Sequence, residues 1–200
     1  MSATVLVISM RAGTILPQGG KDSPGLGNSP PMKIGELQPT MDFTAIEGNE
    51  HPTWTGLKGK VVVIDFWATW CAPCVAAFPR MNALNREFAG QGVFYSVTYE
   101  TASMVGPVLK SHPLETKISL DNDFRTFKSF NAWAIPVVYI FDANGRLAAE
   151  VNAVNLDSAI IRTVMAGKIP NVPQQMAWND PAGAEKYFRS LRNEGEKPKE

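Results

Sequence analysis

The spacing of apolar positions along the chain changes at residue 71. Val61 to Ile64 form a continuous apolar run, which is typical of a strand buried on both faces, as in parallel sheets covered by helices. Beyond residue 71 the apolar positions recur at steps of three and four residues, at Cys74, Phe78, Met81, Leu84 and Phe88. The pattern therefore predicts a buried strand that leads directly into a helix, with Cys71 where the helix begins.

The same reading predicts the other elements in chain order. Strands are expected at 41–46, 93–97, 118–120, 136–141 and 146–151, with 47–49 as a turn and 56–60 as a loop. Helices are expected at 101–111, with an apolar face of Met104, Val105, Val108 and Leu109, and at 124–130. A last helix is expected between Asn155 as its N-cap and Gly167 as its stop. This order indicates an α/β fold, with a mixed central β-sheet and helices on both faces.

Two local signals refine this reading. Phe124, Phe127 and Phe130 recur at helical spacing, which favours core packing over a binding role. Asn144-Gly145, at the end of the turn 142–145, predicts a tight hairpin with positive φ angles.

Composition excludes several function classes. The chain has 200 residues, with Lys+Arg equal to Asp+Glu at 19 each, and no basic block with interleaved aromatic residues predicts a nucleic-acid partner. A hydrophobic content of 44% with five tryptophans indicates a globular domain. No stretch is long and apolar enough to predict a transmembrane segment.

Cys71 and Cys74 are the only two cysteines, and three interpretations of them compete. A zinc site needs more ligands, and the two histidines, His51 and His112, have no ligand spacing, so no metal is expected. A purely structural disulfide would close a very small loop and stabilise the fold little. A redox pair is favoured, because the N–H groups and dipole at a helix start stabilise a thiolate at Cys71. Cys74 would then lie one turn further in and be the more shielded of the two.

The strand, the Cys-x-x-Cys motif and the later strand together carry a family resemblance. Phe66-Trp67-Ala68-Thr69-Trp70-Cys71-Ala72-Pro73-Cys74 ends an apolar strand, and Pro79 follows five residues later. Lys33-Ile34-Gly35, Gly59-Lys60-Val61 and the segment from Ile135-Pro136 to Gly145 also match. The chain resembles the thioredoxin superfamily, above all the TlpA/ResA-like thiol-disulfide oxidoreductases, over about residues 33–168. The resemblance implies a thioredoxin-like fold.

The resemblance also implies roles for the matched positions. Cys71 is expected to be the nucleophile and Cys74 the resolving cysteine. Pro136 is expected to follow a cis peptide bond, so that Ile135 can pair with an extended substrate segment. Asp65, six residues before Cys71, would be a buried acid with a raised pKa that helps to deprotonate Cys74. Trp70, with Ala72 and Pro73 between the cysteines, would contact the substrate, whereas Trp67 would pack in the core.

Two positions depart from the TlpA/ResA-like pattern. Those proteins often have Asn at the position of Asp65 and Glu three residues after the second cysteine, where this chain has Ala77. The acid therefore follows the thioredoxin arrangement, which weakens any inference of the specialised partners of cytochrome maturation. Glu100, after the second strand, is either a substitute acid or a solvated loop residue, and the sequence favours the solvated reading.

The three segments of the chain lead to one functional hypothesis. Residues 1–32 are expected to be a flexible leader or degenerate signal segment, 33–168 the thioredoxin-like domain, and 169–200 an extension with a helix at 182–193 and a charged tail. The apolar run 4–10 fits a poor signal peptide, a mis-assigned start or a disordered leader, and the sequence leaves these open. The resemblance favours a periplasmic or otherwise extracytoplasmic location, with the cytoplasm as the alternative.

The expected activity is thiol-disulfide exchange with protein disulfide or dithiol substrates, more as a reductant than as an oxidant. No cofactor beyond the Cys71–Cys74 disulfide is expected. An upstream electron donor is expected to act on the enzyme, and the protein is expected to be a monomer. Two alternatives remain. A thiol peroxidase would need Thr or Ser three residues before its reactive cysteine, where Ala68 stands. A non-catalytic partner-binding module would not require the intact cysteine pair.

Overall fold

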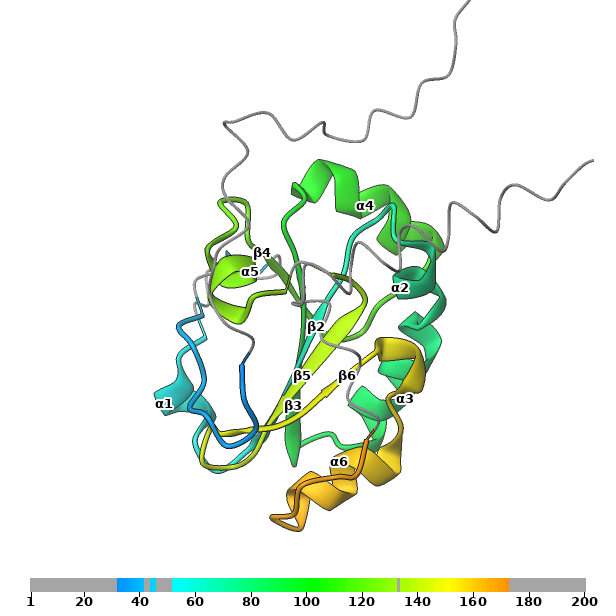
Figure 1. Ribbon diagram of the computed structural model, residues 1–200. Helices are drawn as coiled ribbons and strands as arrows, with labels where there is room; N and C mark the ends of the chain where they lie inside the picture. The colour runs from blue at the N-terminus through cyan, green and yellow to red at the C-terminus, as the bar shows by residue number, and fades with distance from the viewer. Residues whose placement is uncertain (1–31, 42–43, 46–51, 133, 173–200) are drawn as a thin grey trace, which may run out of the picture.

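The computed structural model describes residues 32–41, 44–45, 52–132 and 134–172 (Figure 1). These residues form a six-stranded sheet in the order β1-β4-β3-β2-β5-β6. Its strands are β1 (Thr44–Ala45), β2 (Val61–Phe66), β3 (Gly92–Thr98), β4 (Lys117–Leu120), β5 (Val137–Phe141) and β6 (Leu147–Val151). The expected strands at 61–64, 93–97, 118–120, 136–141 and 146–151 are thus confirmed within one or two residues.

The sheet is mixed, as predicted. β2 pairs with β3 in parallel and with β5 in antiparallel orientation, and all six residues of β2 are buried. β3 and β4 are parallel, whereas β1 and β6 pair with their neighbours in antiparallel orientation. Because β2 and β3 run in parallel, the residues that follow Phe66 and Thr98 lie at the same edge of the sheet.

Alternation along β2 divides the core into two layers. Val61 and Val63 belong to a cluster that also contains Cys71, Cys74, Val105 and Ile161, on the side of α2, α3, α4 and α6. Val62, Ile64 and Phe66 belong to a second cluster with Leu57, Phe127 and Phe130, on the side of α1 and α5. Helices therefore cover both faces of the sheet, and the α/β thioredoxin-like fold class is confirmed (Figure 1).

The helices are α1 (Trp54–Leu57), α2 (Ala72–Ala76), α3 (Phe78–Glu87), α4 (Ala102–Ser111), α5 (Arg125–Phe130) and α6 (Ser158–Met165). The continuous helix expected after Cys71 is instead divided at Ala77 into α2 and α3. Pro79 explains the break, because it has no N–H for the carbonyl of Val75 and its ring crowds that carbonyl. The short helix α1 was not predicted, and its last two residues overlap the loop expected at 56–60. The Thr53 hydroxyl caps it by accepting from the Gly56 N–H at 3.3 Å.

Two other local expectations were wrong in detail, and a third was confirmed. Asp157, not Asn155, caps the last helix, since its Oδ1 accepts from the Ile160 N–H at 2.9 Å, and Asn155 ends a short 3₁₀ turn. The stop at Gly167 is confirmed, with φ of +70°. Of the apolar face expected on α4, Val105 is buried, whereas Met104 is 53% exposed.

The turn between β5 and β6 differs from the expected two-residue hairpin. Gly145 has φ of +74°, but Asn144 is not among the residues with positive φ. The Gly145 N–H bonds the Asp142 carbonyl at 2.9 Å, and Asp142 Oδ1 accepts from the N–H groups of Asn144 and Arg146. This is the pattern of a longer turn that ends in a left-handed glycine. The strand expected at 41–46 is described only at 44–45, and the turn at 47–49 and the helix at 182–193 lie outside the described residues.

Candidate functional site

The two cysteines lie at the carboxyl edge of the central strand, directly after β2. Cys71 and Cys74 form a disulfide, with 5.3 Å between their Cα atoms. Cys71 is the N-cap of α2, and its carbonyl accepts from the N–H groups of Cys74 and Val75 at 3.0 and 3.1 Å. Pro73 occupies the first turn, where no N–H is needed. The predicted redox pair is therefore assembled at a helix start, although α2 itself has only five residues.

The expected difference in shielding between the two cysteines is absent in this disulfide state. Cys71 is 3% exposed and Cys74 is 2% exposed. Both pack in the core layer that includes Val63 and Phe78. The neighbours Ala72 and Pro73 are exposed, so the surface beside the disulfide is formed by them and by Trp70.

Asp65 is buried on β2, as predicted from its place between apolar residues. It is 3% exposed, and alternation puts it on the face of Val63, the layer in which both cysteines pack. Burial raises the pKa of Asp65 from 3.8 to about 7, and the hydrogen bond from the Ser96 hydroxyl at 3.4 Å lowers it in part. Its Oδ1 has no hydrogen-bond partner. A carboxyl with a pKa of about 7 can exchange a proton near neutral pH.

Ser96 is held in turn by the neighbouring strand region. The Thr116 hydroxyl donates to Ser96 Oγ at 2.7 Å, and Ser96 donates to Asp65 Oδ2. Ser96 and Asp65 are also register partners between β3 and β2. The short polar row Thr116–Ser96–Asp65 thus fixes one carboxyl oxygen and leaves the other unbonded.

The peptide bond between Ile135 and Pro136 is cis, as the resemblance predicted. It lies just before β5, the strand that pairs with β2. Pro136 is buried and Ile135 is partly buried.

The two tryptophans of the motif have different environments. Trp67 is fully buried, with its ring edge-on to Phe78 at 5.0 Å, so the expected packing role is confirmed. Trp70 is 65% exposed, and its indole N–H donates to the Tyr99 hydroxyl at 2.7 Å. The structure therefore puts an apolar ring on the surface beside Cys71.

Glu100 is not the solvated loop residue that the sequence favoured. It is 2% exposed, and its carboxylate accepts from the Thr69 N–H and the Thr69 hydroxyl, both at 2.6 Å. Sequence reasoning missed this contact and the hydrogen bond between Trp70 and Tyr99. The signal that could have found them is topological: once β2 and β3 are known to be parallel, the residues after their carboxyl ends must meet at one edge of the sheet.

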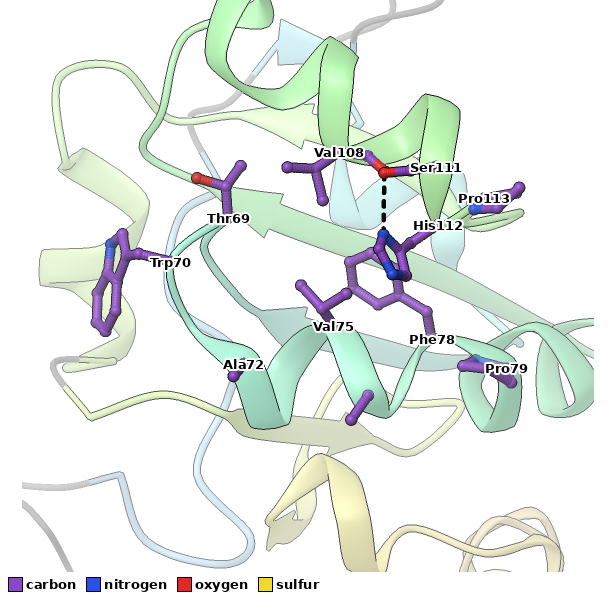
Figure 2. A pocket seen from close by; sticks show the side chains of 11 residues that line it. Thr69, Trp70, Ala72, Val75, Phe78, Pro79, Val108, Ser111, His112 and Pro113 are labelled. Atoms are coloured by element: carbon purple, nitrogen blue, oxygen red, sulfur yellow. Dashed lines mark hydrogen bonds between the residues drawn. The ribbon is translucent and has the colours of Figure 1, made fainter.

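An open groove of about 690 Å³ lies beside the disulfide. Figure 2 shows Thr69, Trp70 and Ala72 at one end, Val75 and Phe78 on one side, and Val108, Ser111 and His112 from the end of α4. His112 Nδ1 lies 3.0 Å from the Ser111 hydroxyl (Figure 2). The lining is mostly apolar, so the groove suits an apolar side chain.

The described ranges contain neither a metal-binding cluster nor a membrane-spanning helix. No group of three or more His, Cys, Asp or Glu side chains that could hold a metal ion occurs there. Across the same part of the chain, no helix combines the length and hydropathy needed to span a lipid bilayer.

The fold and the site define a thioredoxin-like protein with a disulfide after its central strand. Residues 34–150 match the AhpC/TSA family, and the chain belongs to that family. Thiol-disulfide oxidoreductase ResA of Bacillus cereus is 28% identical over 122 residues, which cover 60% of this chain and 70% of that protein. ResA of Bacillus thuringiensis is 26% identical over 149 residues, covering 74% and 83%.

Solved structures support the fold. A thioredoxin-family thiol:disulfide interchange protein from Chlorobium tepidum superposes with a TM-score of 0.54 at 22% identity, over 69% of this chain and 99% of that chain. The thioredoxin domain of a thiol-disulfide oxidoreductase from Bacteroides vulgatus gives 0.56 at 16% identity, over 70% and 99%. The resemblance to TlpA/ResA-like proteins is confirmed, and the chain is an enzyme of the thiol-disulfide oxidoreductase class.

Proposed function

We propose that this enzyme reduces disulfides in protein substrates through Cys71 and Cys74. The observation that carries the proposal is the disulfide itself, formed between two cysteines at the start of a helix. The buried Asp65 on the same face of the sheet supports it, because its pKa of about 7 suits a general base at neutral pH.

The reaction begins with the reduced pair. The Cys71 thiolate attacks one sulfur of the substrate disulfide; the substrate S–S bond breaks, and the departing thiolate takes up a proton. The product is a mixed disulfide between Cys71 and the substrate.

The second step releases the substrate. Asp65 accepts the proton of the Cys74 thiol, and the Cys74 thiolate attacks Cys71. The mixed disulfide breaks, the second substrate sulfur leaves as a thiolate and is protonated, and the Cys71–Cys74 disulfide forms. The substrate has gained two electrons and two protons, which an upstream dithiol donor returns to the enzyme. No other cofactor is required.

The substrate contacts follow from the surface around the disulfide. Trp70, Ala72 and Pro73 form an apolar rim without charge, and the Ile135 backbone before cis-Pro136 offers an edge to an extended segment. A rim of this kind favours extended or partly unfolded protein segments over small charged thiols. The direction is assigned to reduction because Ala72 and Pro73 provide no charge or imidazole that would stabilise the Cys71 thiolate unusually. The resemblance to ResA-like proteins supports a location outside the cytoplasm, and the enzyme is proposed to act as a monomer.

A trapping experiment tests the mechanism. Cys74→Ala removes the resolving thiol, so the mixed disulfide on Cys71 should persist and appear as a mass increase that dithiothreitol reverses. Cys71→Ala is the matched control and should trap nothing. Equal trapping by both variants, or by neither, would contradict the assignment of nucleophile and resolving cysteine.

Two assays separate the alternative functions. The wild-type protein should accelerate the reduction of insulin by dithiothreitol, and it should consume hydrogen peroxide no faster than Cys71→Ala does. Rapid peroxide consumption would favour the thiol peroxidase, while loss of both activities in a folded protein would favour a binding module. Ala68, three residues before Cys71, lacks the hydroxyl that the peroxidase reaction is expected to need.

A further inference from the structure

Two consecutive residues at the end of β3 hold the two residues that precede Cys71. Glu100 accepts two hydrogen bonds from Thr69, through its N–H and its hydroxyl, each at 2.6 Å. Tyr99 accepts the indole N–H of Trp70 at 2.7 Å. Every polar hydrogen of Thr69 and the indole N–H of Trp70 are thereby directed at the two residues that follow β3.

The holding residues are themselves fixed in place. The Thr98 hydroxyl lies 3.3 Å from Glu100 Oε2, and the Asn122 side chain donates to the Glu100 carbonyl at 3.0 Å. The Tyr99 ring stacks on Phe124, with centroids 4.6 Å apart and planes 21° from parallel. Phe124 has φ of +60°, which is uncommon for a bulky residue, and its ring is nevertheless kept against Tyr99.

The position of Glu100 also has an electrostatic consequence. Thr69 is two residues from Cys71, and a chain reaches about 3.5 Å per residue, so the carboxylate lies within roughly 10 Å of the Cys71 backbone. It is buried, so water screens its charge only weakly. A negative charge there disfavours a second negative charge on the Cys71 sulfur.

We propose that Tyr99 and Glu100 are positioning residues for thiol-disulfide exchange. Glu100 fixes the loop before Cys71 and restrains the formation of its thiolate, and Tyr99 holds the Trp70 ring at the edge of the substrate rim. The proposal rests on the proposed function, and it adds a reason for the reducing direction: a disfavoured thiolate makes the dithiol the better electron donor.

Glu100→Gln isolates the charge. A glutamine can accept from the Thr69 N–H and donate to the Thr69 oxygen, so the loop contacts persist while the charge is lost. The readout is the rate at which iodoacetamide alkylates the reduced enzyme, measured from pH 5 to pH 10. The other titratable groups around the loop are Asp65 beneath it, Tyr99, and His112 across the groove, and the variant leaves them unchanged.

The alkylation profile of Glu100→Gln should move to lower pH, with a roughly tenfold increase in the acid dissociation constant of the Cys71 thiol. This magnitude is the effect of removing one charge at about 10 Å with an effective dielectric constant of about 20. Glu115→Gln, the same change at an exposed carboxylate paired with Arg86, should leave the profile unchanged. A folded Glu100→Gln enzyme whose profile lies within twofold of wild type would overturn the role of Glu100.

Tyr99→Phe tests the second residue and should fold, because only a half-buried hydroxyl is lost. We expect the KM for insulin in the reduction assay to be severalfold higher than that of wild type. The fluorescence of Trp70 should change, whereas the rate of alkylation by iodoacetamide should not. Tyr95→Phe, within β3 and four residues before Tyr99, is the control. An unchanged KM would overturn the role of Tyr99. If the wild-type protein does not reduce insulin, the proposed function itself is refuted. The failure of the positioning role and the failure of the proposed function are therefore distinguishable.

Discussion

Asp65→Asn should change the stability of the protein in a strongly pH-dependent way. Burial raises the pKa of Asp65 from 3.8 to about 7, so between these values the folded state binds a proton that the unfolded state has released. The stabilising contribution of this proton is complete below about pH 4 and is lost as the pH rises through about 7. The difference between 3.8 and about 7 corresponds to roughly 4 kcal/mol in the free energy of unfolding.

Asparagine is neutral at every pH and has nearly the same shape as aspartic acid, so the Asp65→Asn protein does not lose this stability as the pH rises. We therefore expect Asp65→Asn to be close to wild type at pH 4 and more stable at pH 8, by up to roughly 4 kcal/mol. The assay is guanidinium unfolding of the oxidised proteins at pH 4, 5.5, 7 and 8, with the free energy extrapolated to water.

Asp157→Asn is the matched control for this experiment. Asp157 is exposed and caps α6, a position where Asn and Asp are about equally good, so its stability should track that of wild type at every pH. A difference between Asp65→Asn and wild type that stays constant from pH 4 to pH 8 would refute the buried, proton-binding carboxyl.

Two further predictions concern the resolving step and the hairpin. Asp65→Asn should slow release of substrate from the mixed disulfide at neutral pH by about tenfold or more, as expected for loss of a general base. Rapid-quench measurements follow that step, and an unchanged rate would show that Asp65 plays no part in it. Gly145→Ala should lower the free energy of unfolding by more than Gly167→Ala does. The φ angles are similar at the two sites, +74° and +70°. The new Cβ at 145 would meet the Gln38 side chain, whereas the one at 167 has nothing within 4 Å. Cβ strain at positive φ alone costs about 1 kcal/mol, so equal losses in urea unfolding would show that Gln38 yields freely.

The parts of the fold that were predictable are those with a strong local pattern. The apolar run at 61–64 defined β2, and the Cys-Ala-Pro-Cys motif defined the disulfide. The cis bond before Pro136 came from the family resemblance and not from any local pattern, since proline at a strand start is common in the trans form too.

The errors have physical reasons. The helical period continues past Ala77 in the sequence, yet the missing N–H of Pro79 divides α2 from α3. Asn155 and Asp157 are equally good caps by type, and only the packing of the short turn before the helix selects Asp157.

Glu100 was misjudged for a different reason. Charged residues after a strand are usually solvated, and the partner of Glu100 lies 31 positions earlier in the chain. Its burial depends on the pairing of β2 with β3, which brings Thr69 to the end of β3. A contact of this kind follows from topology, so it becomes visible only when the strand order is known.

The reduction potential of the Cys71–Cys74 couple would show whether this pair acts as a reductant. It can be measured in glutathione buffers by following tryptophan fluorescence, with Cys74→Ala as the variant that cannot form the disulfide. For a reductant, we expect a two-electron transition near the thioredoxin end of the scale, about −270 mV. A value near about −120 mV would make the protein an oxidant, and a wild-type protein without any two-electron transition would contradict the enzyme itself.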